Sequence, residues 1–309
     1  MEDRTARGAH QDDAGSGTNR RTRARPHHGH ADRWRAPLPT RVTGLPALPA
    51  DYLAALDDGL RELRVDLSEH ARRAIADHVR LLLAWTSAIN LTAIREPSAI
   101  ARLHVLDSLT AVEPLRAAGA TSILDLGSGG GFPGLPLAVA LPESRVLLVD
   151  SIAKKVRFLE AAIGVTGTSG RVAARATRAE VLAHDPTHRE RWDAVTARAV
   201  GPLDELVELA LPLLRIGGRL VAWKRADPAA DPGAEPPGRS PATRTLAAEI
   251  AAAQAVLPPL GGGRVDVHDP GLRFLPGHVL VVVSKVSPAD SRYPRTPRDR
   301  SKSITRSGE

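Results

Sequence analysis

Hydrophobic residues change their spacing near residue 121, which divides the sequence into two regions. Before that point, apolar positions recur at helical spacing in DYLAALDDGLREL, from Asp51, and in ARRAIADHVRLLLAWTSAI, which follows Ser68. Ser68 is a predicted N-cap, because its hydroxyl can accept a hydrogen bond from the first turn of that helix. With residues 98–115, these segments predict a helical subdomain over residues 49–118.

From Thr121 onward, short apolar runs alternate with helical ones. SILDL, RVLLVD, WDAVTARAV and GGRLVAWK have the length of strands, and each precedes a segment of helical spacing. This alternation predicts a parallel sheet with helices on both faces. The last two strands, 264–268 and 278–285, are joined by DPGLRFLPG, which is too short for a parallel crossover, so we expect an antiparallel pair. The strand plan of residues 119–286 resembles the α/β, Rossmann-like class I methyltransferases, whose mostly parallel seven-stranded sheet ends on an antiparallel strand.

Three segments lack any regular spacing of hydrophobic residues. Residues 1–48 are polar and rich in Gly, Arg, His and Pro, and we predict a disordered basic extension or a start codon assigned too early. Residues 226–243 (ADPAADPGAEPPGRSPAT) predict a loop, because Pro and Gly interrupt regular structure. Residues 287–309 predict a basic, flexible tail.

Positive charge is concentrated at the two ends. Residues 1–50 hold nine Arg and five acids, residues 285–309 hold seven basic residues and three acids, and residues 51–284 carry a net charge of −1 out of the total of +7. Basic ends suit a polyanion such as nucleic acid. The alternative is a compositional bias, since nearly all the basic residues are Arg in an Ala-rich chain.

Composition excludes several classes of chemistry. The chain has no Cys, which rules out disulfides, thiolate-bound metals and thiol nucleophiles. Its apolar runs fall short of the ~18 residues of a membrane span, and MEDRTARGAHQDD lacks a signal-peptide core. We expect a cytoplasmic protein, monomeric, with no metal and no membrane attachment.

A glycine cluster follows the first predicted strand in ILDLGSGGGFPGLP. Gly129, Gly131 and Gly134 fit the dinucleotide pattern G-x-G-x-x-G, but the first strand ends near Leu126, which puts that pattern out of register with the turn. The series Asp125, Gly127, Gly129 and Gly131 starts directly at the strand and is typical of S-adenosylmethionine (SAM) loops. The helix that begins near Pro133 adds a favourable field for a carboxylate. The sequence favours SAM over a dinucleotide or a merely structural turn.

Asp150 ends the second strand, VLLVD, where a carboxylate can accept hydrogen bonds from both ribose hydroxyls. An acid at this position serves NAD as well as SAM, and it can also cap the helix that follows. Asp150 therefore indicates a nucleoside without choosing between the two cofactors.

Several strings together resemble one family, the bacterial small-subunit rRNA guanine-N7 methyltransferases of the RsmG (GidB) type. They are DLGSGGGFPGLPLA, LLVDSIAKKVRFL, TRAE (177–180), TARAV (196–200), the upstream NLTAIREPSAIARLHVLDSL (90–109), GGRLVAWK and the tail SRYPRTP. The resemblance covers about residues 52–305 in matching order. The combination of FPGLP, LLVDS-x-x-KK and ARA is specific, whereas any one of them alone is not.

The resemblance implies roles for particular residues. Gly127 and Phe132 would hold SAM, Ala179 with Glu180 would read its adenine, and Arg198 would pair with the SAM carboxylate or an RNA phosphate. On the pattern alone, Phe132 also fits a core position under the loop. Arg198 also fits a structural ion pair with an acid such as Asp193.

Other matching positions suggest where the RNA is bound. Asn90, His104, Asp107 and Ser108 match the family's N-terminal signature, and we expect them to organise the helical subdomain over the target base. Lys224 is a candidate RNA contact. Here Arg225 follows it where the family commonly has Gly, and the 226–243 insert is long, which puts the shape of the RNA-facing rim in doubt.

The absent motifs narrow the reaction. Cytosine C5 methylation needs a Cys nucleophile, and exocyclic amines are often methylated with an Asp/Asn-Pro-Pro-aromatic loop where this chain has TARAVG. Guanine N7 carries an in-plane lone pair and no proton, so its methylation needs no general base. The family implies a guanine in the 530 loop of 16S rRNA, in naked RNA or the 30S subunit. A small-molecule or protein methyltransferase and a non-catalytic nucleotide-binding module remain alternatives.

Overall fold

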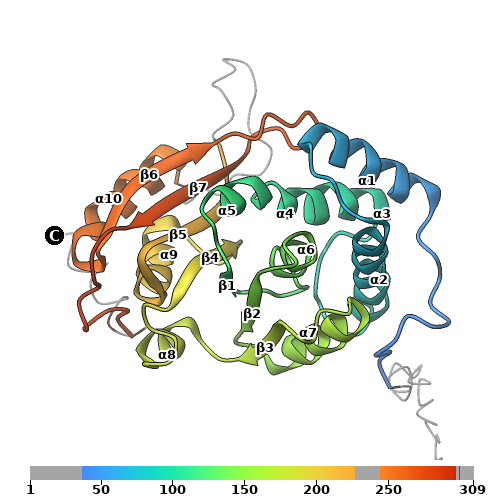
Figure 1. Ribbon diagram of the computed structural model, residues 1–309, viewed down its shortest axis with the longest axis horizontal. Coiled ribbons are helices and arrows are strands. Elements are labelled where there is room, and N and C mark those ends of the chain that lie inside the picture. Colours follow the sequence, from blue (N-terminus) through green and yellow to red (C-terminus); the bar gives the residue numbers. More distant parts are fainter. Residues whose placement is uncertain (1–36, 227–243, 297–298, 300–309) are drawn as a thin grey trace, which may run out of the picture. The chain divides into compact units, whose positions relative to one another are not determined.

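A seven-stranded sheet forms the centre of the chain (Figure 1). The computed structural model describes residues 37–226, 244–296 and 299, and one compact unit begins at Leu38. The strands are β1 (Ser122–Leu126), β2 (Arg145–Asp150), β3 (Val172–Ala176), β4 (Trp192–Arg198), β5 (Leu214–Arg225), β6 (Gly262–His268) and β7 (His278–Lys285). Their order is β3-β2-β1-β4-β5-β7-β6; β1 to β5 pair in parallel, and β7 is antiparallel to β5 and β6. The predicted fold and the antiparallel final pair are confirmed.

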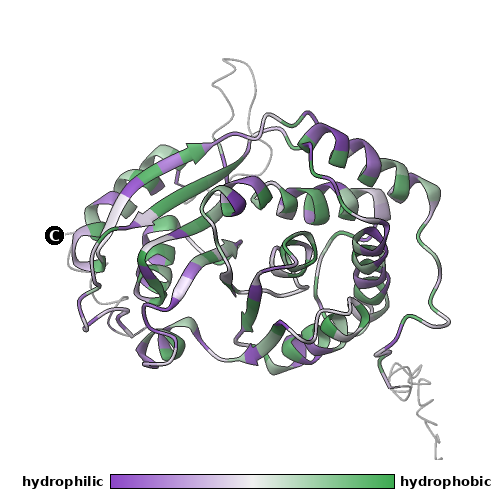
Figure 2. Ribbon diagram, in the orientation of Figure 1, coloured by the Kyte–Doolittle hydropathy of each residue, from purple (hydrophilic) through white to green (hydrophobic). Residues whose placement is uncertain are grey.

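Helices cover both faces of the sheet. The longer ones are α1 (Ala50–Leu63), α2 (Glu69–Thr86), α7 (Ala153–Val165) and α10 (Leu246–Leu260). The shorter ones are α3 (Pro97–Ile100), α4 (Asp107–Leu109), α5 (Val112–Ala117), α6 (Gly134–Ala140), α8 (Ala179–His184) and α9 (Leu203–Ala210), with a 3-10 turn, η2, at Leu211–Leu213. Figure 2 shows hydrophobic residues along the strands and polar residues on the outer sides of α1 and α2. None of the described helices is long and apolar enough to cross a membrane.

Alternation along each strand produces two separate cores. Ile123 packs with α1, α2, α6 and α7 on one face, whereas its neighbour Leu124 packs with α8, α9 and α10 on the other. Successive side chains of a strand point to opposite faces, so an apolar run buried on both sides builds both layers at once. The helical region and the sheet share the first core, and the structure joins them in one compact unit.

The N-terminal region is helical, as predicted, and its last helical segment is divided into several pieces. The Ser68 hydroxyl accepts a hydrogen bond from the Ala71 amide at 3.2 Å, which confirms the predicted cap. Residues 98–115, predicted as part of the helical subdomain, form α3, a π-helical turn at Ala101–Leu106 (η1), α4 and α5. A π turn inserts an extra residue and rotates the side chains that follow, a feature frequent at functional sites.

The prediction that residues 1–48 are disordered is wrong for residues 38–48. Trp85 Nε1 donates a hydrogen bond to the Pro39 carbonyl at 2.7 Å, and the Arg80 guanidinium donates to the carbonyls of Val42, Leu45 and Pro46. Backbone carbonyls thus fix this segment on α2, and no spacing of apolar residues encodes such contacts. Residues 1–36 lie outside the described residues.

The tail predicted to be flexible from residue 287 is likewise docked as far as residue 296. Arg295 pairs with the buried Glu208 of α9 at 2.6 Å, and Arg189 donates to the Tyr293 carbonyl at 2.8 Å. A buried carboxylate needs a paired cation, so Glu208 holds the tail in place. Residues 227–243 of the predicted loop and 300–309 of the tail lie outside the described residues.

Candidate functional site

The glycine-rich loop follows the carboxyl end of β1, and three of its residues have a left-handed backbone conformation. Gly127, Gly129 and Gly131 have φ angles of +71°, +52° and +87°. A Cβ on Gly127 would lie 2.8 Å from Val200 Cγ2, in the loop that follows β4. Both the dihedral and the close neighbour favour glycine at this position. The loop therefore presents bare backbone at the sheet edge where α/β folds bind their ligands.

Asp150 ties the end of β2 to this loop. Its Oδ2 accepts a hydrogen bond from the Gly129 amide at 3.0 Å, and its Oδ1 accepts one from the Ile152 amide at 2.9 Å. Lys155 Nζ lies 3.9 Å from the same carboxylate. Asp150 thus lies beside the glycine loop at the carboxyl edge, where the sequence places a ribose-binding acid.

Asp125 lies beneath the loop and has no solvent exposure. Thr196 Oγ1 donates to its Oδ1 at 2.8 Å, and the Gly134 amide donates to its Oδ2 at 3.2 Å. Burial raises the pKa of this carboxyl group to about 6. The sequence predicted Asp125 among the cofactor contacts, but its carboxyl group is enclosed by protein, so its effect on a ligand passes through the loop that it supports.

Arg198, at the end of β4, makes a structural ion pair, but with a different acid from the one predicted. Its Nη1 lies 3.0 Å from Asp107 Oδ2 and donates to the Leu103 carbonyl at 3.0 Å. Asp193 is at the opposite end of β4 and pairs with Arg215. Asp107 comes from α4, far away in the sequence, so only the tertiary structure identifies the partner.

Phe132 lies between two histidine rings and below this guanidinium. Its centroid is 4.7 Å from that of His78 and 4.9 Å from that of His104, and Arg198 Cζ lies 5.5 Å above the ring. Phe132 is 5% exposed and belongs to the core. Phe132 therefore occupies a core position under the loop, and its predicted contact with SAM stays a prediction.

Both histidine rings are electrically neutral at pH 7. Burial lowers the pKa of His78 to about 4, and burial with the nearby Arg198 lowers that of His104 to about 4. His104 Nδ1 lies 3.2 Å from Arg198 Nη2 and 3.1 Å from the Leu103 carbonyl, and its Nε2 lies 2.7 Å from Thr92 Oγ1. A single cation, Arg198, thus overlies a neutral aromatic group.

Asp107 connects the helical region to the sheet through three contacts. Besides Arg198, its carboxylate contacts His278 Nδ1 at 3.0 Å, and its carbonyl accepts from Trp223 Nε1 at 2.7 Å. Ser108 is buried, and its hydroxyl donates to the His104 carbonyl at 2.5 Å. The predicted organising role of this segment receives support at His104, Asp107 and Ser108.

Two site residues were missed by the sequence reasoning. His78 Nε2 lies 2.8 Å from the Gly130 carbonyl of the loop, and His278 reaches Asp107 from the start of β7. The signal for His78 was a histidine on the buried face of α2, beside Ile75 and Val79. No local signal marked His278.

The other predicted site residues, Lys224, Ala179, Glu180 and Asn90, lie outside the cluster around Phe132 and Arg198. Lys224 Nζ lies 2.5 Å from Glu249 Oε2 and donates to the Gly201 carbonyl at 2.8 Å, so its charge is paired. Ala179 and Glu180 begin α8, after the carboxyl end of β3, and are half-buried. Asn90 is exposed in the connection between α2 and α3.

A hollow of about 250 Å³ adjoins this site beyond the ends of β4 and β5. Its lining includes Arg198, Val200, Gly201, Trp223 and Lys224. Of the described residues that line it, Asp107 is the one acid, and its carboxylate is taken up by Arg198 and His278. The hollow is therefore bounded by cations and an indole, without a free carboxylate.

The carboxyl edge of the sheet fits SAM chemically. Bare backbone at Gly127 allows close approach, Asp150 offers carboxylate oxygens to a ribose, and Ala179 and Glu180 begin α8 beyond the neighbouring strand. Among the described residues, no group of three or more His, Asp or Glu side chains is arranged to hold a metal ion.

Comparisons with known proteins agree on one family. Residues 71–234 match the family described as GidB, rRNA small subunit methyltransferase G. The ribosomal RNA small subunit methyltransferase G of Roseiflexus sp. (strain RS-1) is 40% identical over 69% of this chain and 83% of its own length. The protein of the same name from Chloroflexus aggregans is 41% identical over 75% of this chain and 89% of its own length.

Solved structures of lower similarity accompany these relatives. The apo form of the SAM-dependent methyltransferase SibL covers 77% of this chain and 69% of its own length, at 18% identity and a TM-score of 0.43. Such a distant likeness adds nothing on substrate. The strand order of the sheet and the family match carry the assignment.

Proposed function

The chain belongs to the rRNA small subunit methyltransferase G family, and we propose that it transfers a methyl group from SAM to N7 of a guanine in the 530 loop of 16S rRNA. The SAM-dependent activity on small-subunit rRNA follows from the family. The target atom and the 530 loop are what the family resemblance implies, and the site supports the choice of atom. The observation that carries the choice of atom is that Asp107, the one acid among the described residues that line the hollow beside Arg198, is already paired with Arg198 and His278.

The residues of the carboxyl edge bind and orient the cofactor. Bound SAM supplies a methyl group activated by its sulfonium centre. The bare backbone of the Gly127–Gly131 loop would approach its methionine end, Asp150 would accept from the ribose, and Ala179 with Glu180 would contact the adenine. Arg198 is already paired with Asp107, so its part is to fix Phe132 and His104 beneath the cofactor.

Guanine N7 suits a site without a general base. The atom carries a lone pair and no proton, so attack on the methyl group requires alignment and no proton transfer. Asp107 is paired twice, and the chain contains no Cys for addition to a pyrimidine ring. Alignment of two bound reactants contributes up to ~7–11 kcal/mol in favourable cases.

The purine is expected in the hollow beside Gly201, with Trp223 and Lys224 on its walls. Methylation places a positive charge on the guanine. Asp107, which lines the same hollow, is the carboxylate nearest to that charge among the described lining residues, and Arg198 and His278 hold it in place. The hollow thus positions the base, and the ion-paired network holds its walls.

The test is transfer of tritium from labelled SAM to RNA. We expect label in 16S rRNA, supplied as 30S subunits or as naked RNA, at a guanine that becomes sensitive to borohydride and aniline cleavage. The Gly127→Val variant serves as the inactive control. Absence of label from both substrates, or label on an exocyclic amine, would refute the proposal.

A further inference from the structure

One ring nitrogen of His278 is unused in the hollow beside Arg198. His278 is the first residue of β7 and lines that hollow, with 15% of its side chain exposed. Its Nδ1 lies 3.0 Å from Asp107 Oδ1. Its Nε2 has no hydrogen bond to any residue that the structure describes. The ring is thus anchored at one nitrogen and open at the other.

Asp107 determines which nitrogen of the neutral ring can accept a hydrogen bond. A carboxylate only accepts, so the proton of the neutral ring lies on Nδ1, beside Asp107, and Nε2 keeps a lone pair. Asp107 is held in turn by Arg198 at 3.0 Å, and its carbonyl accepts from Trp223 Nε1 at 2.7 Å. The lone pair of His278 Nε2 is therefore held in place by contacts that form without a ligand.

Side chains that accept hydrogen bonds are scarce in this hollow. Among the described residues that line it, Asp107 and His278 are the two with side-chain acceptors, because the others are aliphatic residues, Gly, Trp, Lys and Arg. Asp107 is buried and paired with Arg198 and His278, and the Gly201 carbonyl accepts from Lys224. His278 Nε2 is therefore the side-chain acceptor that remains for a ligand.

The strand order places this acceptor across the hollow from the cofactor loop. The glycine loop follows β1, and β4, β5 and β7 come next in that order across the sheet. His278 is level with Arg225, the last residue of β5, so both lie at the carboxyl edge. Neighbouring strands lie about 4.8 Å apart, which separates the backbones of β4 and β7 by about 10 Å. A base between them would have the cofactor on one side and His278 on the other.

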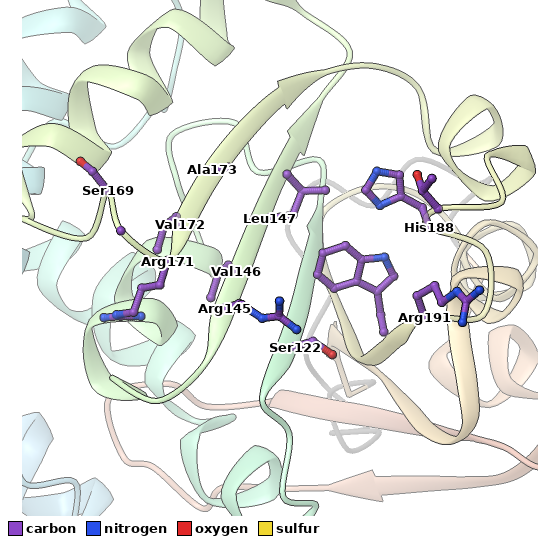
Figure 3. Close-up of a pocket in the computed structure, with 13 residues that line it drawn as sticks. Ser122, Arg145, Val146, Leu147, Ser169, Arg171, Val172, Ala173, His188 and Arg191 are labelled. Carbon is purple, nitrogen blue, oxygen red and sulfur yellow. The ribbon is translucent and has the colours of Figure 1, made fainter.

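A second hollow is too remote to hold the target base. It has a volume of about 430 Å³ and lies at the amino edge of the sheet, where β1 to β4 begin (Figure 3). Along β2, about 17 Å separate Arg145 at that edge from Asp150. The hollow beside Arg198 instead adjoins the glycine loop, because its lining residue Val200 lies against Gly127.

Guanine has its N7 atom and its N–H donors on opposite sides of the ring system. N7 and O6 accept hydrogen bonds, whereas the N1–H and the 2-amino group on the Watson–Crick edge donate them. With N7 toward the glycine loop, that edge points toward β7. Adenine has neither donor, because its N1 is an acceptor and it lacks the 2-amino group. The open nitrogen of His278 thus fits guanine and does not fit adenine.

We propose that His278 determines specificity for guanine, with Nε2 accepting a hydrogen bond from the Watson–Crick edge of the target base and Asp107 positioning the ring. The proposal rests on the proposed function, since it requires a guanine in this hollow with N7 toward the cofactor. A base without the N–H group leaves Nε2 unpaired. Sites built to hydrogen-bond an N–H group reject analogues that lack it for this reason.

The test compares three purines at the methylated position of a synthetic RNA. They are guanine, hypoxanthine, which lacks the 2-amino group, and 2-aminopurine, which lacks N1–H. For the wild type, kcat/KM should fall about tenfold on loss of the donor that His278 contacts. In His278→Phe, which keeps a ring without an acceptor, the same change of base should cost nothing further. An analogue alters N7 equally for both enzymes, so the difference between the enzymes isolates the contact.

Two further variants separate recognition from a structural role. His278→Gln keeps an amide donor and acceptor and should restore part of the discrimination. His268→Gln is the matched control, because His268 is exposed on the neighbouring strand β6 and is not among the residues that line the hollow. It should discriminate as the wild type does. A structural role of His278 would lower kcat/KM for all three RNAs by the same factor.

Failure of the proposed function gives a different result from failure of this contact. If the wild type methylates no RNA guanine, the contact is measured without methyl transfer, from the nitrogen-15 resonance of Nε2 in histidine-labelled protein, assigned by its absence from His278→Phe. This resonance should move more on addition of guanosine than of inosine or 2-aminopurine riboside. Equal discrimination in the wild type and His278→Phe, or equal movement of the resonance with all three nucleosides, would overturn the proposal.

Discussion

The two edges of the sheet differ in whether their charged side chains are paired. At the carboxyl edge, Arg198 and Lys224 are paired with Asp107 and Glu249, and Asp150 accepts hydrogen bonds from two loop amides. At the amino edge, Arg145 and Arg191 have no partner among the described residues. The charged groups of the carboxyl edge are thus paired within the protein, whereas these two arginines of the amino edge are exposed and unpaired among the described residues.

The contrast shows how the pairing of charges relates to stability. Paired charges hold the carboxyl edge in one geometry before any ligand binds, which suits a reaction that depends on alignment. The two arginines at the amino edge have no such partner among the described residues, so they contribute little to folding. Substitutions should therefore cost stability at the first edge and little at the second.

The largest expected effect is at the glycine loop. Gly127→Val should reduce SAM affinity more than a hundredfold, because φ of +71° is strained for a β-branched residue and its Cβ would press on Val200. Calorimetric titration with SAM measures the loss. Gly119→Val is the matched control, since Gly119 has φ of +60° with open space around it and is remote from the loop. Equal affinity in both variants would contradict the pocket assignment.

Removal of Asp107 comes next. Asp107→Ala leaves the Arg198 guanidinium and His278 without their buried partner, and should lower the free energy of unfolding by about 3–5 kcal/mol. Urea unfolding gives this value directly. Asp58→Ala is the control, because its pair with Arg61 is exposed and is worth little. Similar losses in the two variants would mean that the Asp107 network is not a structural unit.

Lowering the pH should reduce the stability of the fold through His78, which contacts the glycine loop. Burial lowers its pKa to about 4, so the unfolded chain takes up a proton below about pH 6.5 that the folded chain does not. The contribution of His78 to stability is complete above pH 6.5 and falls by about 3 kcal/mol as the pH drops to 4. Asp125, whose pKa burial raises to about 6, acts in the opposite sense, so the comparison must be between variants.

We expect His78→Gln to lose less stability than the wild type between pH 6.5 and 4, measured as the difference between their unfolding free energies. His70→Gln, on the exposed side of the same helix, should follow the wild-type curve. Parallel curves for the wild type and His78→Gln would show that this ring titrates alike in the folded and unfolded chains.

The smallest effect is expected at the amino edge. Arg145→Gln should change the free energy of unfolding by no more than about 0.5 kcal/mol, because the side chain is exposed and has no partner among the described residues. Thermal and urea unfolding check this value against Asp107→Ala. A loss above 1 kcal/mol would remove the distinction between the two edges.

Much of this architecture was readable from local patterns. The alternation of apolar runs, the short link before β7 and the cap at Ser68 are set by residues near one another in the chain, and each was confirmed. The glycine series after β1 predicted a ligand-binding loop directly after that strand, and the positive φ angles found there are a local property of Gly.

The errors concern contacts between distant residues. The partner of Arg198 is 91 residues away, and the segments 38–48 and 287–296 are held by carbonyls and by Glu208. Lys224, a candidate RNA contact in the sequence, is paired with Glu249 of α10, a partner that the sequence did not indicate. In each case a polar group is satisfied across the fold, and no spacing along the chain reports such a bond.

The sequence by itself determined the succession of strands and helices, the place of the glycine loop after the first strand and the family, because periodicity and motif spacing are properties of consecutive residues. Only the tertiary structure decided which charges are paired, which rings enclose Phe132 and which arginines remain open at the opposite edge. The physical reason is that burial and hydrogen bonding act between whatever side chains the packed elements bring together, regardless of their separation along the chain.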